Sequence, residues 1–265
     1  MKPDLSVPRI GLARALSKLG YCSRQQAALL IRAGRVRINS NVRRDPETPV
    51  HLPQDRILVD GRAVEPQRKI YLIMNKPRGL VTTASDEKGR ATIYEVLENV
   101  GESLPWLAPV GRLDKASEGL LLLTNDSEWG ASIAAPESHL PKTYHVQIGI
   151  LADNKVMQAI VSGVTTEDGE VLRATHARIL RCGTKNCWLE IILDQGKNRH
   201  IRRMLAAIHV EVLRLVRVAI GPLQLGQLAK GAYRVLTIDE KLALDRAMKK
   251  IRPGDPAIAR KKFAI

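Results

Sequence analysis

Residues 111–126 read GRLDKASEGLLLLTND, in which a charged turn leads directly into four consecutive leucines. An apolar run this short suits a fully buried strand better than a helix. Such a strand would place Asp114 on a turn at the edge of a core, where a charged side chain can meet a substrate. Most Asp residues in turns are structural, however, so this stretch by itself favours an ordinary turn ahead of a core strand.

The length and composition of the chain predict a soluble globular protein of one large or two modest domains. Its 265 residues, 45% of them hydrophobic, are enough for a substantial core. No run of about 18 apolar residues occurs and the start opens no signal peptide, so we expect a cytoplasmic protein without a membrane segment. Three cysteines are too few for a disulfide framework, and Cys182 and Cys187 lack a second Cys/His pair with which to bind zinc.

The net charge of +15 is concentrated at the two ends of the chain. Residues 1–70 hold 14 Lys/Arg against 6 Asp/Glu, and residues 246–265, which read as a basic flexible tail, hold 7 against 1. Residues 71–245 are nearly neutral. Basic ends fit a polyanion partner, whose binding releases counterions. RNA and DNA both satisfy this, whereas an anionic membrane is disfavoured because no amphipathic basic helix occurs.

Residues 9–66 are predicted to form a small basic module of two helices followed by strands. Ser23 and Gln26 form the capping-box pattern of the second helix, and residues 35–39 and 56–61 are typical of strands. Few acids lie near the arginines around this helix and the first strand, which favours a nucleic-acid face over a merely solvated surface. These arginines are Arg24, Arg32, Arg35, Arg37, Arg43 and Arg44.

Residues 70–245 are predicted to form an α+β body with a mixed, largely antiparallel sheet flanked by helices. They lack the regular strand–helix alternation of a parallel sheet, and we expect about 10–12 strands and four or five helices. Residues 71–83 read as a strand, a turn and a second strand, and Lys76 on that turn could either meet phosphate or be solvated. Residues 142–148 alternate as a strand that carries Tyr144 on its apolar face.

A second basic segment, residues 196–205, reads GKNRHIRRML. Here a loop that begins with glycine enters a helix with Ile201 and Met204 on its apolar face. Its basic residues are not accompanied by an acid, and the N–H groups of a helix start also attract anions, so a polyanion site is favoured over a solvated helix start. These basic residues are Lys197, Arg199, Arg202 and Arg203.

Four segments in this order resemble the pseudouridine synthases of the RsuA branch, which isomerise uridines in ribosomal RNA. They read NKPRG at residues 75–79, the sixteen-residue stretch at 111–126, KTY at 142–144 and GKNRHIRRM at 196–204. The basic module resembles the RNA-binding module of a ribosomal small-subunit protein, and the resemblance covers about residues 10–245. The chain departs from the family pattern at His200, where Gln is usual.

The resemblance implies that a uridine leaves its stack to enter a pocket. Asp114 would be the essential carboxylate, acting as nucleophile or as base on the sugar. Arg202 would pair with it through a two-pronged hydrogen bond, and Tyr144 would stack on the uracil. No cofactor or metal is implied, since nothing is oxidised, reduced or hydrolysed. The remaining candidates for contact with the substrate or the RNA are Arg112, Lys76, Lys142, Lys197, Arg199, His200, Ile201, Arg203, Arg24, Arg35 and Arg37.

The expected partner is ribosomal RNA or a pre-ribosomal particle, bound by a monomer, and residues 88–90 lean towards the large-subunit enzymes. Two other readings stay open at this point. A non-catalytic RNA-binding or ribosome-assembly factor would also carry basic ends. A hydrolase could use Asp114 and Glu118 as paired carboxylates.

Overall fold

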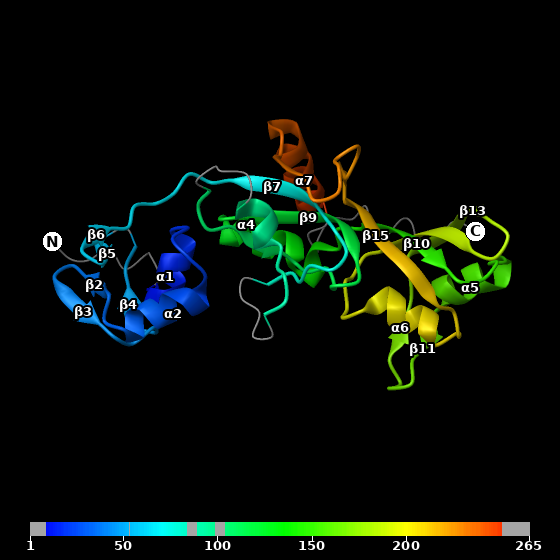
Figure 1. Ribbon diagram of the computed structural model, residues 1–265, viewed down its shortest axis with the longest axis horizontal. Coiled ribbons are helices and arrows are strands. Elements are labelled where there is room, and N and C mark those ends of the chain that lie inside the picture. Colours follow the sequence, from blue (N-terminus) through cyan, green and yellow to red (C-terminus); the bar gives the residue numbers. More distant parts are fainter. Residues whose placement is uncertain (1–8, 53, 84–88, 99–103, 251–265) are drawn as a thin grey trace. The chain divides into compact units, whose positions relative to one another are not determined.

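The computed structural model describes residues 9–52, 54–83, 89–98 and 104–250. The chain divides into two compact units (Figure 1). The first comprises Met1–Tyr71, Val100–Ala108 and Leu123–Glu128, and the second comprises Leu72–Asn99, Pro109–Leu122 and Trp129–Ile265. None of the helices in the described ranges combines the length and the apolar character that spanning a membrane requires.

The first unit contains two helices and a small antiparallel sheet. Helix α2 (Arg24–Arg32) starts with the predicted capping box, in which Gln26 N donates to Ser23 Oγ at 3.1 Å and Ser23 N donates to Gln26 Oε1 at 3.0 Å. The other elements are α1 (Leu12–Lys18), the sheet β3 (Asn41–Arg43), β2 (Val36–Ile38), β5 (Ile57–Val59) and β6 (Arg62–Ala63) in this order, and the pair β1 (Ile10–Gly11) and β4 (Pro49–Val50). Apolar residues of both helices and of the sheet form one core.

The second unit is built on a nine-stranded sheet. Its main order is β13 (His176–Cys182), β14 (Cys187–Leu193), β10 (Lys142–Ile148), β15 (Val212–Ile220), β9 (Glu118–Thr124), β7 (Tyr71–Lys76) and β17 (Tyr233–Val235); β16 (Leu223–Gln224) pairs with β15 and β8 (Ala108–Val110) with β9. Strands β13, β14, β10 and β15 pair antiparallel, whereas β15 and β9 run parallel. The predicted mixed, largely antiparallel sheet is thus confirmed.

Helices and a short hairpin complete the second unit. Helix α6 (His200–Ala206) packs against β15, and α5 (Asn154–Ser162) packs against β13 (Figure 1). The others are α3 (Tyr94–Glu98), α4 (Ser127–Ala134), the 3-10 helix Pro136–Ser138, α7 (Ile238–Lys250) and the pair β11 (Val164–Thr165) and β12 (Val171–Leu172). Helices α3, α4, α5 and α6 lie close to helices that the sequence predicts, whereas α7 and the 3-10 helix were not predicted.

Strand β9 is the buried strand that the four leucines predict. All seven of its residues are buried, because β9 has strands on both sides in the sheet. At its start Gly119 has a φ of +103°, and a Cβ there would lie 2.3 Å from the carbonyl oxygen of Arg217 on β15. Only glycine allows this approach, so Gly119 brings β15 next to the turn that carries Asp114.

Several local predictions were wrong. The second strand expected after the turn at residues 76–79 is only an isolated bridge from Val81 to Thr92. The expected tail from residue 246 is helical as far as Lys250, while residues 251–265 lie outside the described part. The strand count of the body, by contrast, agrees with the prediction, because the described part of residues 70–245 holds eleven strands, β7 to β17, where 10–12 were expected. A disulfide also joins Cys182 to Cys187, which face each other across the β13–β14 hairpin.

Candidate active site

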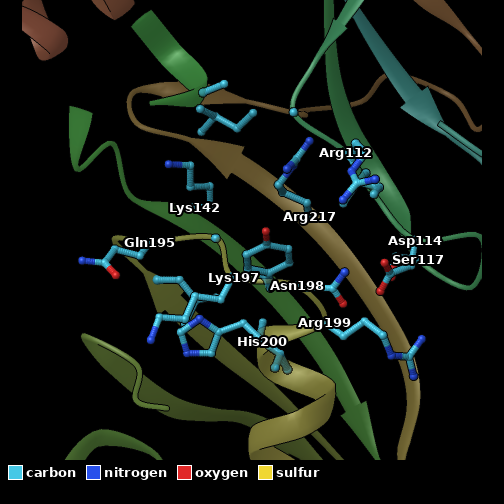
Figure 2. Close-up of a pocket in the computed structure, with 18 of the residues that line it drawn as sticks. Arg112, Asp114, Ser117, Lys142, Gln195, Lys197, Asn198, Arg199, His200 and Arg217 are labelled. Atoms are coloured by element: carbon cyan, nitrogen blue, oxygen red, sulfur yellow. The ribbon is translucent and has the colours of Figure 1, made fainter. Parts of the chain in front are cut away.

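A pocket of about 560 Å³ lies in the second unit, and several distant segments of the chain line it (Figure 2). They are the turn before β9, the start of β10, the loop that leads into α6 and the second half of β15. The pocket brings together eight of the residues proposed from the sequence: Arg112, Asp114, Lys142, Tyr144, Lys197, Arg199, His200 and Ile201. The sheet thus assembles three of the four sequence motifs around one cavity, whereas the motif at residues 75–79 does not line it.

Hydrogen bonds hold the turn that carries Asp114 in place. Ser117 N donates to Asp114 O at 2.9 Å and closes the turn. One residue earlier, the hydroxyl of Thr82 donates to Leu113 O at 2.8 Å and accepts from Leu113 N at 3.3 Å. The Asp114 side chain is half-buried at the pocket wall. A carboxylate fixed in this way is prepared for chemistry on a bound molecule.

Lys76, which the sequence proposed as an RNA contact, is buried next to this turn and supports it. Its side chain is completely buried, and its Nζ donates to three main-chain oxygens: Pro77 at 3.1 Å, Asp114 at 3.2 Å and Ser117 at 3.0 Å. Burial lowers the pKa of Lys76 to about 8, while the carboxylates of Asp114 and Glu118 oppose the shift. The ammonium is therefore neither solvated nor available to a phosphate.

Arg202 also binds the main chain and does not grip Asp114 with two hydrogen bonds. Its Nη2 donates to Ala116 O at 3.2 Å and its Nη1 to Val212 O at 3.3 Å. Burial, followed by the nearby Arg199, lowers its pKa, and the Asp114 carboxylate opposes this effect. The expected two-pronged bond is thus replaced by a link from α6 to the backbone two residues beyond Asp114.

Tyr144 belongs both to the core and to the pocket. Its side chain is only 9% exposed, and its strand places it opposite Ile191 on β14 and Arg217 on β15. Ile201, which is 3% exposed, contributes an apolar side chain to the same pocket. The aromatic ring and this aliphatic neighbour form a surface on which a flat base could stack.

The basic loop before α6 supplies fewer free cations than its sequence suggests. Lys197 lines the pocket but pairs with Glu170 at 2.7 Å. Arg203, which does not line the pocket, pairs with Asp168 and Glu170, both at 2.7 Å. Of the two roles that the sequence suggests for Arg203, a contact with RNA phosphate or local structure, the ion pairs favour local structure.

Arg199 and His200 take up separate positions at the start of α6. Arg199 precedes the helix in a left-handed conformation with a φ of 47° and lines the pocket. His200 is 7% exposed in the pocket wall, and its burial, reinforced by Lys197, lowers its pKa. Burial favours the neutral form of the imidazole, so His200 resembles in charge the Gln that is usual at this position.

Glu118 does not form the carboxylate pair that a hydrolase would need. It is 3% exposed and makes ion pairs with Arg214 at 3.1 Å and Lys230 at 2.6 Å. It does not line the pocket, whereas Asp114 does. Across the described ranges, no cluster of three His, Cys, Asp or Glu side chains could hold a metal ion.

The first unit presents its own basic surface. Arg24, Arg37 and Arg43 are exposed and make no ion pair with any residue that the structure describes. Arg35, by contrast, pairs with Asp60, its Nε donating to Oδ1 at 2.9 Å. Three of the proposed arginines are thus free to meet a polyanion, and one is engaged within the protein.

Sequence reasoning missed four polar residues of the pocket: Ser117, Gln195, Asn198 and Arg217. Asn198 lies in the segment 196–205 that the sequence did single out, and Gln195 directly precedes that segment. Arg217 lies on β15, a nine-residue strand that was not predicted. The run VLRLVRVAI at 212–220, rich in valine and other apolar residues, is a strand signal that could have revealed it.

Comparison with known proteins adds sequence relatives and a solved structure. The family model for RNA pseudouridylate synthase matches residues 70–207, and the S4 domain model matches residues 10–57. An uncharacterized RNA pseudouridine synthase of Aquifex aeolicus is 38% identical, covering 90% of this chain and 95% of its own length. Ribosomal large subunit pseudouridine synthase B of Bacillus subtilis is 32% identical, covering 86% of this chain and 93% of its own. A crystal structure of a pseudouridylate synthase is 27% identical with a TM-score of 0.60, covering 89% of this chain and 99% of that one.

Proposed function

The chain belongs to the RNA pseudouridylate synthase family, and we propose that it converts particular uridines of ribosomal RNA to pseudouridine with Asp114 as the essential carboxylate. The family and the RNA-binding module that the sequence predicted are confirmed, so the protein is an RNA pseudouridine synthase with an S4 domain. The choice of ribosomal RNA, and within it the large-subunit RNA, is supported by the name of the Bacillus subtilis relative.

One observation carries the assignment of Asp114. Among the described residues that line the pocket it is the only acid, and Tyr144 and Ile201 line the same pocket. A carboxylate at one side of a cavity with an aromatic and an aliphatic wall suits a nucleoside whose sugar meets the acid and whose base stacks on the ring. The alternative of paired carboxylates lacks support, because Glu118 points to Arg214 and Lys230 instead.

In the proposed reaction a uridine leaves its stack and enters the pocket. The bond from uracil N1 to ribose C1′ breaks, the base turns, and uracil C5 bonds to C1′. The proton at C5 is released, and N1 takes up a proton, so that atoms and charge balance. Asp114 acts either as the nucleophile at C1′ or as the base that removes a proton from the sugar.

Lys76 and Arg202 act on this reaction as positioning residues. Lys76 binds the main-chain oxygens of Asp114 and Ser117, and Arg202 binds that of Ala116. Together they fix the turn from both β7 and α6. A displaced carboxylate would lose much of its effect, because even a shift of about 1 Å can cost a large factor in rate.

Release of tritium from RNA labelled at uracil C5 tests the proposal, because only bond formation at C5 frees that proton. We expect the full chain to release tritium from unmodified ribosomal RNA, and Asp114→Asn to bind the same RNA without releasing any. Wild-type protein that binds this RNA but releases no tritium contradicts the proposal and favours a role as an RNA-binding or ribosome-assembly factor. Chemical mapping of pseudouridine in both ribosomal RNAs from a deletion strain then identifies the subunit.

A further inference from the structure

Arg217 is a buried cation in the pocket to which the reaction just described gives no role. Its side chain is only 5% exposed, although a buried arginine normally needs partners. Its Nε donates to Leu120 O at 2.7 Å, but the buried Nη2 makes no hydrogen bond to any residue that the structure describes. A buried donor without a partner costs free energy, which favours a ligand that supplies the missing acceptor.

A β-bulge directs this arginine into the pocket. Pairing between β10 and β15 shifts between Thr143 and Tyr144, so that Thr143 faces Ala219 while Tyr144 faces Arg217. The extra residue, Val218, reverses the side-chain alternation and places Arg217 beside Tyr144. Bulges of this kind often re-aim a side chain at a site, and here the re-aimed side chain lines the same pocket as Tyr144.

Arg217 does not stand alone, since Lys142 and Arg112 line the same pocket. Figure 2 shows these three cations along one side of the cavity, opposite Gln195, Lys197 and His200. Burial, followed by the charge of Arg217, lowers the pKa of Lys142 to about 8, and Asp194 opposes the shift. Lys142 and Arg217 thus repel each other, and an anion bound between them would relieve that repulsion.

The charge of the pocket lining also favours an anionic ligand. Among the described residues, five basic side chains line it against the single acid Asp114: Arg112, Lys142, Lys197, Arg199 and Arg217. Lys197 is already compensated by Glu170, whereas Arg112, Lys142 and Arg217 make no ion pair with a described residue. Uracil is neutral, so the base alone does not explain three cations on one side.

We infer that Arg217, Lys142 and Arg112 form a phosphate subsite, which binds one backbone phosphate of the nucleotide whose base lies on Tyr144. The inference rests on the proposed function, because it takes the ligand to be a uridine nucleotide of an RNA chain. Arg217 supplies the fixed, buried donor, and its bond to Leu120 O sets the direction of the guanidinium. Phosphate binding there fixes the sugar relative to Asp114, so Arg217 positions the substrate.

A purely structural role is the competing explanation, since the bond to Leu120 O also ties β15 to β9. Binding of small nucleotides separates the two. Calorimetric titration would compare uridine with uridine 5′-monophosphate and uridine 3′-monophosphate, using the full chain and its variants Arg217→Met, Arg217→Lys and Lys142→Met. Arg181→Met is the matched control, because Arg181 is exposed on β13, contacts the ring of Trp188 and does not line the pocket.

We expect the wild type and the Arg181→Met control to bind one monophosphate about tenfold or more tighter than uridine, as a charge-assisted hydrogen bond allows. Arg217→Met should remove this preference while leaving the affinity for uridine within about twofold, and Arg217→Lys should keep part of it. Should Arg217→Met fail to fold, as judged by circular dichroism, Lys142→Met must show a reduced preference. An equal loss for uridine and both monophosphates, or a wild type without any preference, overturns the subsite.

The titration needs no turnover, so its result is independent of the tritium assay. If the wild type prefers a monophosphate but releases no tritium from ribosomal RNA, the subsite stands and the proposed function fails. If tritium is released without any phosphate preference, the function stands and the subsite fails.

Discussion

The ammonium group of Lys76 donates a hydrogen bond of 3.2 Å to the main-chain oxygen of Asp114. The same nitrogen reaches the main-chain oxygen of Ser117 at 3.0 Å, so one buried cation binds both ends of the turn. The two partners come from β7 and from the segment before β9, which are separated by 38 positions in the sequence. The placement of the proposed catalytic carboxylate therefore depends on a residue that does not line the pocket.

The first prediction concerns this support. Lys76→Met keeps the length of the side chain but leaves three carbonyl oxygens without their donor, at about 1–3 kcal/mol for a buried unsatisfied group. We expect a lower melting temperature and a loss of tritium release of about tenfold or more, with RNA affinity within about twofold. Lys155→Met is the matched control, because Lys155 is exposed on α5. Wild-type activity in Lys76→Met would show that the turn holds Asp114 without this lysine.

Asp114→Asn tests the carboxylate itself. The amide has the same shape but is a poor nucleophile and a poor base, so we expect tritium release to fall by at least about 10³-fold. RNA binding should be unchanged, because Asp114 supplies no positive charge. Filter binding and tritium release on the same RNA preparation measure both. Weaker binding with proportionally weaker release would instead indicate a role in holding the RNA.

Gly119→Ala tests the contact between β9 and β15. The added Cβ would lie 2.3 Å from the oxygen and 2.8 Å from the nitrogen of Arg217, which are backbone atoms that cannot move aside alone. Gly79→Ala is a close control, since Gly79 has a φ of +102° and open space around it. We expect the control to lose about 1–2 kcal/mol of unfolding free energy from backbone strain and Gly119→Ala to lose clearly more. If urea unfolding showed that both variants lose the same free energy of unfolding, the close approach of β9 and β15 at Gly119 would contribute nothing to stability.

The sequence predicts the parts of this site that lie within single motifs. The four leucines of β9 indicate a buried strand without reference to the rest of the chain, because their run is short and bounded by polar residues. The capping box of α2 depends on residues three apart, so local spacing suffices to find it. The assignment of Asp114 came from the family resemblance, and its spacing alone favoured a structural turn.

The roles of Lys76 and Arg217 could not be read from local sequence. A lysine in a turn reads as solvated, and only the packing of β7 beneath the turn buries its ammonium among three carbonyls. Arg217 faces Tyr144 because of one bulge, and a bulge reverses the very alternation from which a strand face is predicted. Both roles arise from contacts between distant segments, which periodicity does not encode.

The pKa of Lys142 predicts a pH dependence of nucleotide binding. Burial and Arg217 lower this pKa from 10.5 to about 8, so the side chain is charged below that pH and neutral above it. The preference for uridine monophosphate over uridine should therefore decrease between pH 7 and 9, although bound phosphate will move the midpoint upwards. Calorimetry over this range measures it, and the phosphate stays doubly charged because its second pKa is about 6.

Lys142→Met should make that profile flat, and a decrease that persists in this variant would assign the pH dependence to another group.

The lowered pKa of Lys142 also predicts how the stability of the folded protein depends on pH. Between about pH 8 and 10.5 the unfolded chain holds more protons on this lysine than the folded protein does. The contribution of Lys142 to the free energy of unfolding must then increase with pH across that window.

The basic surface of the first unit predicts salt-dependent RNA binding that is separable from chemistry. Arg24, Arg37 and Arg43 are exposed, and each one that meets a phosphate adds about 0.7 to the slope of log affinity against log salt for single-stranded RNA. Replacing all three by Gln should make the slope shallower by about 2 if all three make contact. Tritium release at saturating RNA should persist, because none of the three lines the pocket. Arg35→Gln is the comparison, since Arg35 already pairs with Asp60 and its loss should change the slope by less than one free arginine does. An unchanged slope in the triple variant would place the RNA on another surface of the protein.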